Sequence, residues 1–148
     1  SSVPGLRSGF VAGDPNILGR FKQVRDYGGA PPPIPLLAVA AALWQDEKHV
    51  EEDRLFYQRK FEIADQKLAG LHGYYLPDGG FYLWLDVGDS EAAALKLWQN
   101  AALRVIPGAY LAKTDRDGQN PGSAYIRCAL VHDLETTAQA LDRLVETL

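Results

Sequence analysis

Two arginines lie in apolar stretches that also carry small residues. Arg7 lies in PGLRSGFVAG, and Arg127 lies in AYIRCAL. A guanidinium among apolar side chains is costly unless it binds an anion. Its planar fork of donors matches a phosphate or a carboxylate, whereas the alternative is an edge-strand arginine that pairs with a surface acid. The occurrence of two such arginines in one chain favours the anion-binding interpretation.

The residues around Arg127 predict its orientation. In AYIRCALV, strand alternation places Tyr125, Arg127 and Ala129 on one face and Ile126 and Cys128 on the other. Cys128 is then expected to be a small buried hydrophobe. Arg127 is therefore expected on the face opposite Cys128, where it could bind a substrate carboxylate through two hydrogen bonds.

The elements that must position these arginines follow from local signals. Asp14 and Pro15 form a strong helix start, because Asp caps the helix and Pro fits its first position. Gly28 and Gly29 then end that helix. In order, the expected elements are a strand over 5–13, helices over 15–27, 36–44 and about 46–70, a strand over 81–87, a helix capped by Ser90 and ending near Ala102, a short strand in LRVIPG, a strand over 124–131 and a helix capped by Asp133. This order predicts the α/β class, with an α+β arrangement of the elements within this chain.

Two of the expected helices carry apolar stripes at helical spacing. The remaining face of the long helix is full of charged side chains and is expected to be solvated. The stripe of the long helix is Val50, Tyr57, Phe61, Ala64 and Leu68, and that of the last helix is Leu134, Ala138, Leu141, Val145 and Leu148.

Composition excludes several classes of function. The net charge of −4 over 148 residues gives no general affinity for nucleic acid. No apolar run approaches the roughly 20 residues that cross a bilayer. The single cysteine, Cys128, excludes an internal disulfide framework and fits a reducing, cytoplasmic compartment. The three histidines lack metal-ligand spacing, and DRDGQN at 115–120 is expected to be a turn rather than a calcium loop. Because the chain has no Met, we expect that its natural start lies upstream.

The opening stretch resembles a motif of the class I, fold type I aminotransferases that depend on pyridoxal 5'-phosphate. Gly5, Arg7 and Gly9 match the second half of the family pattern S-K-x-x-x-x-x-G-x-R-x-G. The resemblance implies that Arg7 binds the cofactor phosphate. It also implies that the Schiff-base lysine lies two positions before Ser1, so that no catalytic residue lies in this chain.

The resemblance continues in family order to the end of the chain. YIRCALV, followed by HDLETTAQALDRLV, is similar to the strand whose arginine binds the substrate carboxylate, which implies this role for Arg127. PDGGFYLWLDV is similar to the strand that starts the small domain, which places Gly80 and Phe81 near the substrate. VRDYGGAPPPIP resembles a loop that reaches the neighbouring active site of a homodimer. Tyr27 and Gly28 are candidates for that contact, and the alternative is a helix stop followed by a proline linker.

The resemblance also implies a domain organisation and a reaction. Residues 1–45 would end the large cofactor-binding domain, 46–72 would form an interdomain helix, and 73–148 would form the small C-terminal α+β domain. Within this family, the sequence is most similar to the bacterial succinyldiaminopimelate aminotransferases of lysine biosynthesis. The substrates would be an amino acid, N-succinyl-LL-2,6-diaminopimelate or glutamate, and a 2-oxo acid, and the chain alone would be inactive. Two alternatives stay open: another class I enzyme, such as an aspartate aminotransferase, and a non-catalytic amino-acid-binding or oligomerisation module.

Overall fold

The computed structural model describes residues 3–29 and 31–148. The chain divides into two compact units, Ser1–Arg54 and Leu55–Leu148, and each is described by itself. The division falls within the long helix α3, Glu47–Leu68. The presence of α3 confirms the helix expected over about 46–70. The domain boundaries expected after residues 45 and 72 stay predictions.

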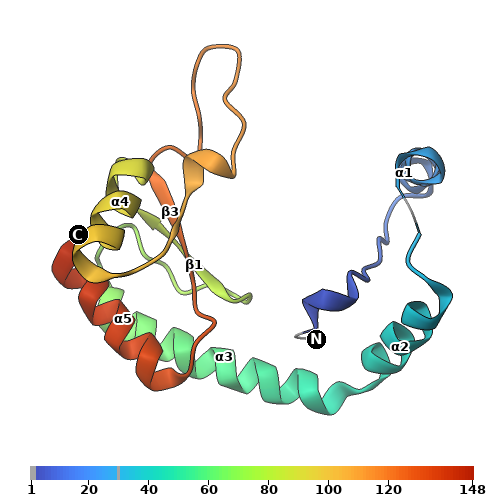
Figure 1. Ribbon diagram of the computed structural model, residues 1–148, viewed down its shortest axis with the longest axis horizontal. Coiled ribbons are helices and arrows are strands. Elements are labelled where there is room, and N and C mark those ends of the chain that lie inside the picture. The colour runs from blue at the N-terminus through green and yellow to red at the C-terminus, as the bar shows by residue number, and fades with distance from the viewer. Residues whose placement is uncertain (1–2, 30) are drawn as a thin grey trace. The chain divides into compact units, whose positions relative to one another are not determined.

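The first unit is helical (Figure 1). It contains the single-turn helix η1, Pro4–Leu6, the helices α1, Pro15–Gly28, and α2, Ile34–Gln45, and the first turns of α3. The predicted cap of α1 is confirmed, because the Asp14 carboxylate accepts hydrogen bonds from the backbone N–H groups of Asn16 (2.8 Å) and Ile17 (3.1 Å). Among the described residues of this unit only Ala40 is buried.

The strand expected over residues 5–13 is wrong. The described residues there form η1 followed by irregular backbone, and Arg7 adopts the left-handed conformation with φ 50°. An isolated strand leaves its backbone N–H and C=O groups without partners, and no strand of the described chain pairs with this segment. The local pattern was compatible with a strand but could not supply a neighbour for it.

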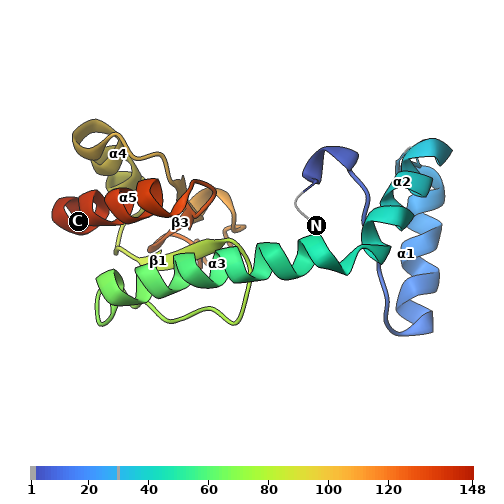
Figure 2. The same ribbon diagram turned by 90° about the horizontal axis from the view of Figure 1, so that it is seen from below.

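The second unit contains a three-stranded antiparallel sheet of order β1-β3-β2. The strands are β1, Tyr82–Asp86, β2, Ile106–Pro107, and β3, Tyr125–Ala129. The helices α4, Ser90–Ala101, and α5, Leu134–Thr147, run beside the strands together with the C-terminal part of α3 (Figure 2). The short turn η2, Gly108–Tyr110, follows β2, and a long loop then leads to β3.

One face of this sheet packs against the helices and forms the core. Leu83, Leu85 and Ile126 are at most 1% exposed and contact the buried faces of the three helices. Tyr82, Trp84 and Arg127 alternate with them along the strands and lie on the other face. The alternation predicted for the strand that carries Arg127 is thus confirmed, and β1 alternates in the same way. Among the described residues of this unit, no helix covers the outer face of the sheet.

The caps and stripes of the helices needed small corrections. The cap of α4 is Asp89 rather than Ser90, because Asp89 accepts from the N–H groups of Glu91 and Ala92, while Ser90 is buried as the first helical residue. Asp133 caps α5 as expected. The buried stripe of α5 runs through Thr137, Leu141 and Leu144, whereas the flanking residues of the predicted stripe are half-buried. The buried stripe therefore shares Leu141 with the predicted one and is rotated from it toward Thr137 and Leu144.

No helix in the described part of the chain has the length and apolarity needed to span a membrane.

Candidate functional site

Arg127 lies at the centre of the outer face of the sheet. It is the middle residue of β3, the central strand, and its register partners are Trp84 of β1 and Ile106 of β2. Its neighbours Ile126 and Cys128 point to the opposite face, toward the core. A central strand cannot slip by one residue without exposing its buried residues, so the register holds Arg127 on the outer face.

Aromatic rings surround the guanidinium. Its carbon Cζ lies 5.2 Å from the centre of the Tyr82 ring and 5.9 Å from that of the Phe81 ring. Both distances suit a cation–π contact. Beside them, the Trp84 and Tyr125 rings stack with centres 5.6 Å apart and planes at 15°. The rings fix the position of the side chain without neutralising its charge.

The guanidinium retains unused hydrogen-bonding capacity. The Nε atom of Arg127 is buried and has no hydrogen-bond partner among the residues that the structure describes. No ion pair to Arg127 occurs within the described part of the chain. A buried N–H group without an acceptor costs free energy, and a carboxylate that accepts from Nε and a terminal nitrogen would relieve that cost. The outer face of the sheet is therefore suited to bind a carboxylate.

The turn before β1 brings a second predicted residue to this place. Gly80 has φ 105°, a conformation that other residues rarely adopt, and it leads directly into Phe81. The carbonyl of Phe81 accepts a hydrogen bond from the N–H of Leu130 (2.8 Å), which ties the start of β1 to the end of β3. Of the residues predicted from the sequence, the structure thus brings Gly80, Phe81 and Arg127 together.

The remaining predicted site residues lie in the first unit. Arg7 is exposed, and its side chain forms no hydrogen bond or ion pair with another described residue. Its exposed guanidinium offers a planar fork of donors, which fits a phosphate. Tyr27 is 90% exposed on the last turn of α1, which ends at Gly28. The role of Tyr27 and Gly28 across a subunit boundary stays a prediction.

Sequence patterns did not single out two further residues of the second unit, Tyr82 and Lys60. Tyr82 contacts the guanidinium, although only its place in the alternating strand pointed to it. Lys60 was assigned to the solvated face of the long helix, and this assignment is wrong because Lys60 is fully buried. Its spacing of three residues from Tyr57 and four from Ala64, both in the predicted stripe, was the available signal.

Other groups that could do chemistry do not contribute a second centre. Burial raises the pKa of the Cys128 thiol to about 11, so the thiol stays protonated near neutral pH and is a poor nucleophile. Asp115 accepts hydrogen bonds from the N–H groups of Asp117 and Gln119, which confirms a turn in the segment 115–120. Among the described residues no cluster of His, Cys, Asp or Glu could hold a metal ion.

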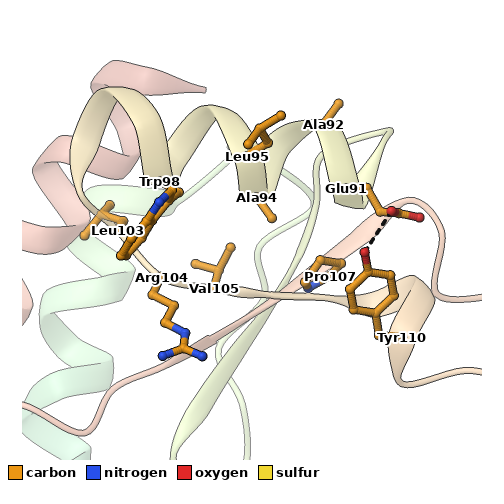
Figure 3. A pocket seen from close by; sticks show the side chains of 10 residues that line it. All are labelled: Glu91, Ala92, Ala94, Leu95, Trp98, Leu103, Arg104, Val105, Pro107 and Tyr110. Carbon is orange, nitrogen blue, oxygen red and sulfur yellow. Dashed lines mark hydrogen bonds between the residues drawn. The ribbon is translucent and has the colours of Figure 1, made fainter.

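An open groove of about 700 Å³ lies between α4 and the segment that contains β2. Figure 3 shows its lining, including the hydrogen bond from the Tyr110 hydroxyl to the Glu91 carboxylate (2.9 Å). This bond raises the pKa of the Tyr110 hydroxyl. None of the predicted site residues lines the groove, so it is separate from the Arg127 site.

Comparisons with known proteins give a consistent result. The family model described as "Aminotransferase class I and II" matches residues 1–144. The chain is 32% identical over 146 residues to the 4-dedimethylamino-4-oxo-anhydrotetracycline transaminase OxyQ of Streptomyces rimosus, covering 97% of this chain and 38% of that protein. It is 28% identical over 150 residues to the LL-diaminopimelate aminotransferase of Syntrophobacter fumaroxidans, covering 97% of this chain and 36% of that protein.

A solved structure supports the same relationship. An aminotransferase from Neisseria meningitidis Z2491 superposes with a TM-score of 0.81 at 46% identity, covering 99% of this chain and 37% of that one. The chain thus spans little more than a third of the length of the proteins it matches.

Proposed function

Because the chain belongs to the class I and II aminotransferases, we propose that the protein containing it transfers an amino group between an amino acid and a 2-oxo acid. Residues 1–148 would form its C-terminal part. The observation that carries the proposal is the buried Nε of Arg127, which lacks an acceptor among the described residues on an open, aromatic face of the sheet. Amino acids and 2-oxo acids share an α-carboxylate, so one arginine can bind both substrates of the reaction.

Arg127 would also orient the substrate. A bidentate pair fixes the direction of the carboxylate, and the rings of Phe81 and Tyr82 lie within cation–π distance of the guanidinium. An anchored carboxylate limits rotation of the substrate, so that its Cα–H bond is held in one direction for proton removal. The chain's own contribution to the reaction is therefore binding and orientation.

The family uses pyridoxal 5'-phosphate, and we extend this cofactor to the present protein. When bound, the cofactor supplies an electron sink for the charge that develops at Cα of the amino acid. The exposed guanidinium of Arg7, which has no hydrogen bond or ion pair with another described residue, suits its phosphate group. The lysine that carries the cofactor would lie two positions before Ser1, as the motif around Arg7 implies.

Replacing Arg7 by glutamine in the full-length protein is expected to weaken cofactor binding by roughly tenfold to a hundredfold, because charge-assisted hydrogen bonds to the phosphate are lost. The dissociation constant is measured by titrating the apoprotein with pyridoxal 5'-phosphate and following its absorbance. Arg20→Gln, a change at an exposed arginine of α1, is the matched control and should leave the constant unchanged. Equal affinities for the wild type and the Arg7 variant would remove Arg7 from the cofactor site.

The finer substrate assignment is N-succinyl-LL-2,6-diaminopimelate with glutamate as the paired amino acid, in lysine biosynthesis. The segments SSVPGLRSGFVAGD and IPGAYLA support this assignment, because they resemble succinyldiaminopimelate aminotransferases. The 28% identity to a protein named LL-diaminopimelate aminotransferase supports it as well. The slightly more similar relative OxyQ is named for a tetracycline intermediate, so family membership leaves the substrate open. An aspartate aminotransferase activity is the second candidate in the same family.

Transfer of amino groups by the full-length protein tests the function. We expect the reconstituted protein to form glutamate from 2-oxoglutarate with the succinylated diaminopimelate as donor, and to do so more slowly with aspartate. The isolated 148-residue chain should show no turnover, since the proposed lysine is outside it. A full-length protein that binds no cofactor and uses no amino acid of a broad panel would instead support a non-catalytic binding module. Turnover by the purified chain would contradict the position proposed for the lysine.

The organisation of the whole protein is part of the proposal. Residues 1–45 would belong to the large domain, 46–72 to the interdomain helix and 73–148 to the small domain. The absence of buried residues from α1 supports the first assignment, because an isolated helix with exposed apolar side chains needs further surface to pack against. We also propose a cytoplasmic homodimer in which Tyr27 and Gly28 reach the neighbouring subunit's site.

A further inference from the structure

Lys60 is a fully buried lysine in the second unit. It lies on α3, and its Nζ donates a hydrogen bond of 2.6 Å to the carbonyl of Leu130. The same atom lies 4.2 Å from the centre of the Phe56 ring and 4.6 Å from that of the Tyr57 ring. Two aromatic faces and one carbonyl thus hold an ammonium group inside the core.

This arrangement is expensive as a way to stabilise the fold. Desolvation lowers the pKa of Lys60, and the charge of Asp133 only partly opposes that shift. An apolar side chain of similar length would fill the same space without the cost of removing a charge from water. The role of the ammonium group must therefore lie in the segment that its contacts hold in place.

The acceptor of Lys60 is directly connected to the Arg127 site. Leu130 follows β3 immediately, three residues after Arg127, and its N–H donates to the carbonyl of Phe81 (2.8 Å). The ring of Phe81 in turn lies 5.9 Å from the guanidinium carbon of Arg127. The backbone of a single residue, Leu130, is thus held by α3 through its carbonyl and holds the start of β1 through its N–H.

We propose that Lys60 is a positioning residue for the carboxylate site: through the carbonyl of Leu130 it fixes the end of β3 and the start of β1, and so the placement of Phe81 against Arg127. The inference rests on the proposed function, because the carboxylate is that of the substrate. Without the ammonium, the carbonyl of the buried Leu130 loses its side-chain donor, and the segment 128–132 can shift relative to α3.

Kinetics of the full-length protein with L-glutamate and 2-oxoglutarate test this role. Lys60→Met keeps the length of the side chain and removes its charge and donors. We expect the KM for both compounds to rise about tenfold while kcat changes less than about twofold, since displacement of a binding group by a fraction of an ångström weakens substrate binding. Lys60→Arg, which restores a charged donor, should recover most of the affinity.

The matched control is Lys67→Met. Lys67 also lies on α3 and ties this helix to α5 through an ion pair with Asp142, but it has no connection to β1 or β3. The Lys67→Met variant should be less stable than the wild type and have the same KM. A KM for Lys60→Met within about twofold of the wild type, or an equal rise in Lys67→Met, overturns the proposal. If Lys60→Met does not fold, Lys60→Gln, whose shorter side chain carries no charge, replaces it, and a KM within about twofold of the wild type overturns the proposal in the same way.

A second measurement separates this inference from the proposed function. Hydrogen–deuterium exchange of the full-length protein, read in peptides that cover 79–84 and 128–132, should be faster in Lys60→Met and unchanged in Lys67→Met. This readout needs no turnover. Loss of all turnover in the wild type contradicts the proposed function alone, whereas unchanged exchange in Lys60→Met contradicts the role of Lys60 alone.

Discussion

Replacing Arg127 by alanine in the full-length protein is expected to raise the KM for the amino acid and the 2-oxo acid by about a hundredfold. The change removes two charge-assisted hydrogen bonds to the substrate carboxylate, and a joint loss of about 3 kcal/mol corresponds to this factor. The loss should appear in KM and in kcat/KM for both substrates, because both carry the same carboxylate. Steady-state kinetics with glutamate and 2-oxoglutarate measure it.

Two further variants test whether the rise in KM depends on the planar pair of donors in the Arg127 guanidinium. Arg127→Lys keeps the charge and loses the planar pair of donors, so an intermediate rise of about tenfold is expected. Arg104→Ala removes an exposed arginine that lines the separate groove beside α4, and its KM should equal that of the wild type. An unchanged KM in Arg127→Ala, with the fold intact by circular dichroism, would remove Arg127 from the substrate site.

A substitution of Gly108 by alanine is expected to destabilise the fold by about 2–3 kcal/mol. A Cβ atom there would collide with the carbonyl of Gly122 and lie 2.7 Å from that of Tyr125 and 2.9 Å from Cη2 of Trp84. Two of these neighbours are backbone atoms that cannot move aside separately. The close approach places the loop before β3 against the turn after β2, beside the strand that carries Arg127. Urea denaturation should show the loss as a lower midpoint.

Two other glycines provide the comparison. Gly79→Ala lies in the turn before β1, where a Cβ atom would meet nothing within 4 Å, and should change the free energy of unfolding by less than about 0.5 kcal/mol. Gly122→Ala presses against the same contact from the other side, since its Cβ would meet the carbonyl of Gly108. Its cost should therefore resemble that of Gly108→Ala. Equal midpoints for the Gly108 and Gly79 variants would show that the contact is easily relaxed.

Local signals in the sequence predicted most elements of the chain. The cap at Asp14, the alternation of the strand that carries Arg127 and the cap at Asp133 all depend on residues that are near neighbours in the chain. The same signals failed where the partner is distant. The segment 5–13 had the composition of a strand, yet it forms no strand because a ladder needs a neighbour that no local pattern supplies.

The sequence by itself determined which residue types are available for anion binding and on which face of its strand Arg127 lies. Only the tertiary structure decided what surrounds that arginine. Strand register sets Trp84 and Ile106 beside it, and the turn at Gly80 brings the Phe81 ring to the guanidinium. It also buried Lys60 against a carbonyl 70 residues away, although the sequence assigned that lysine to a solvated face. The physical reason is that capping and alternation act between near neighbours, whereas the environment of a buried charge is the sum of contacts between distant segments that only packing brings together.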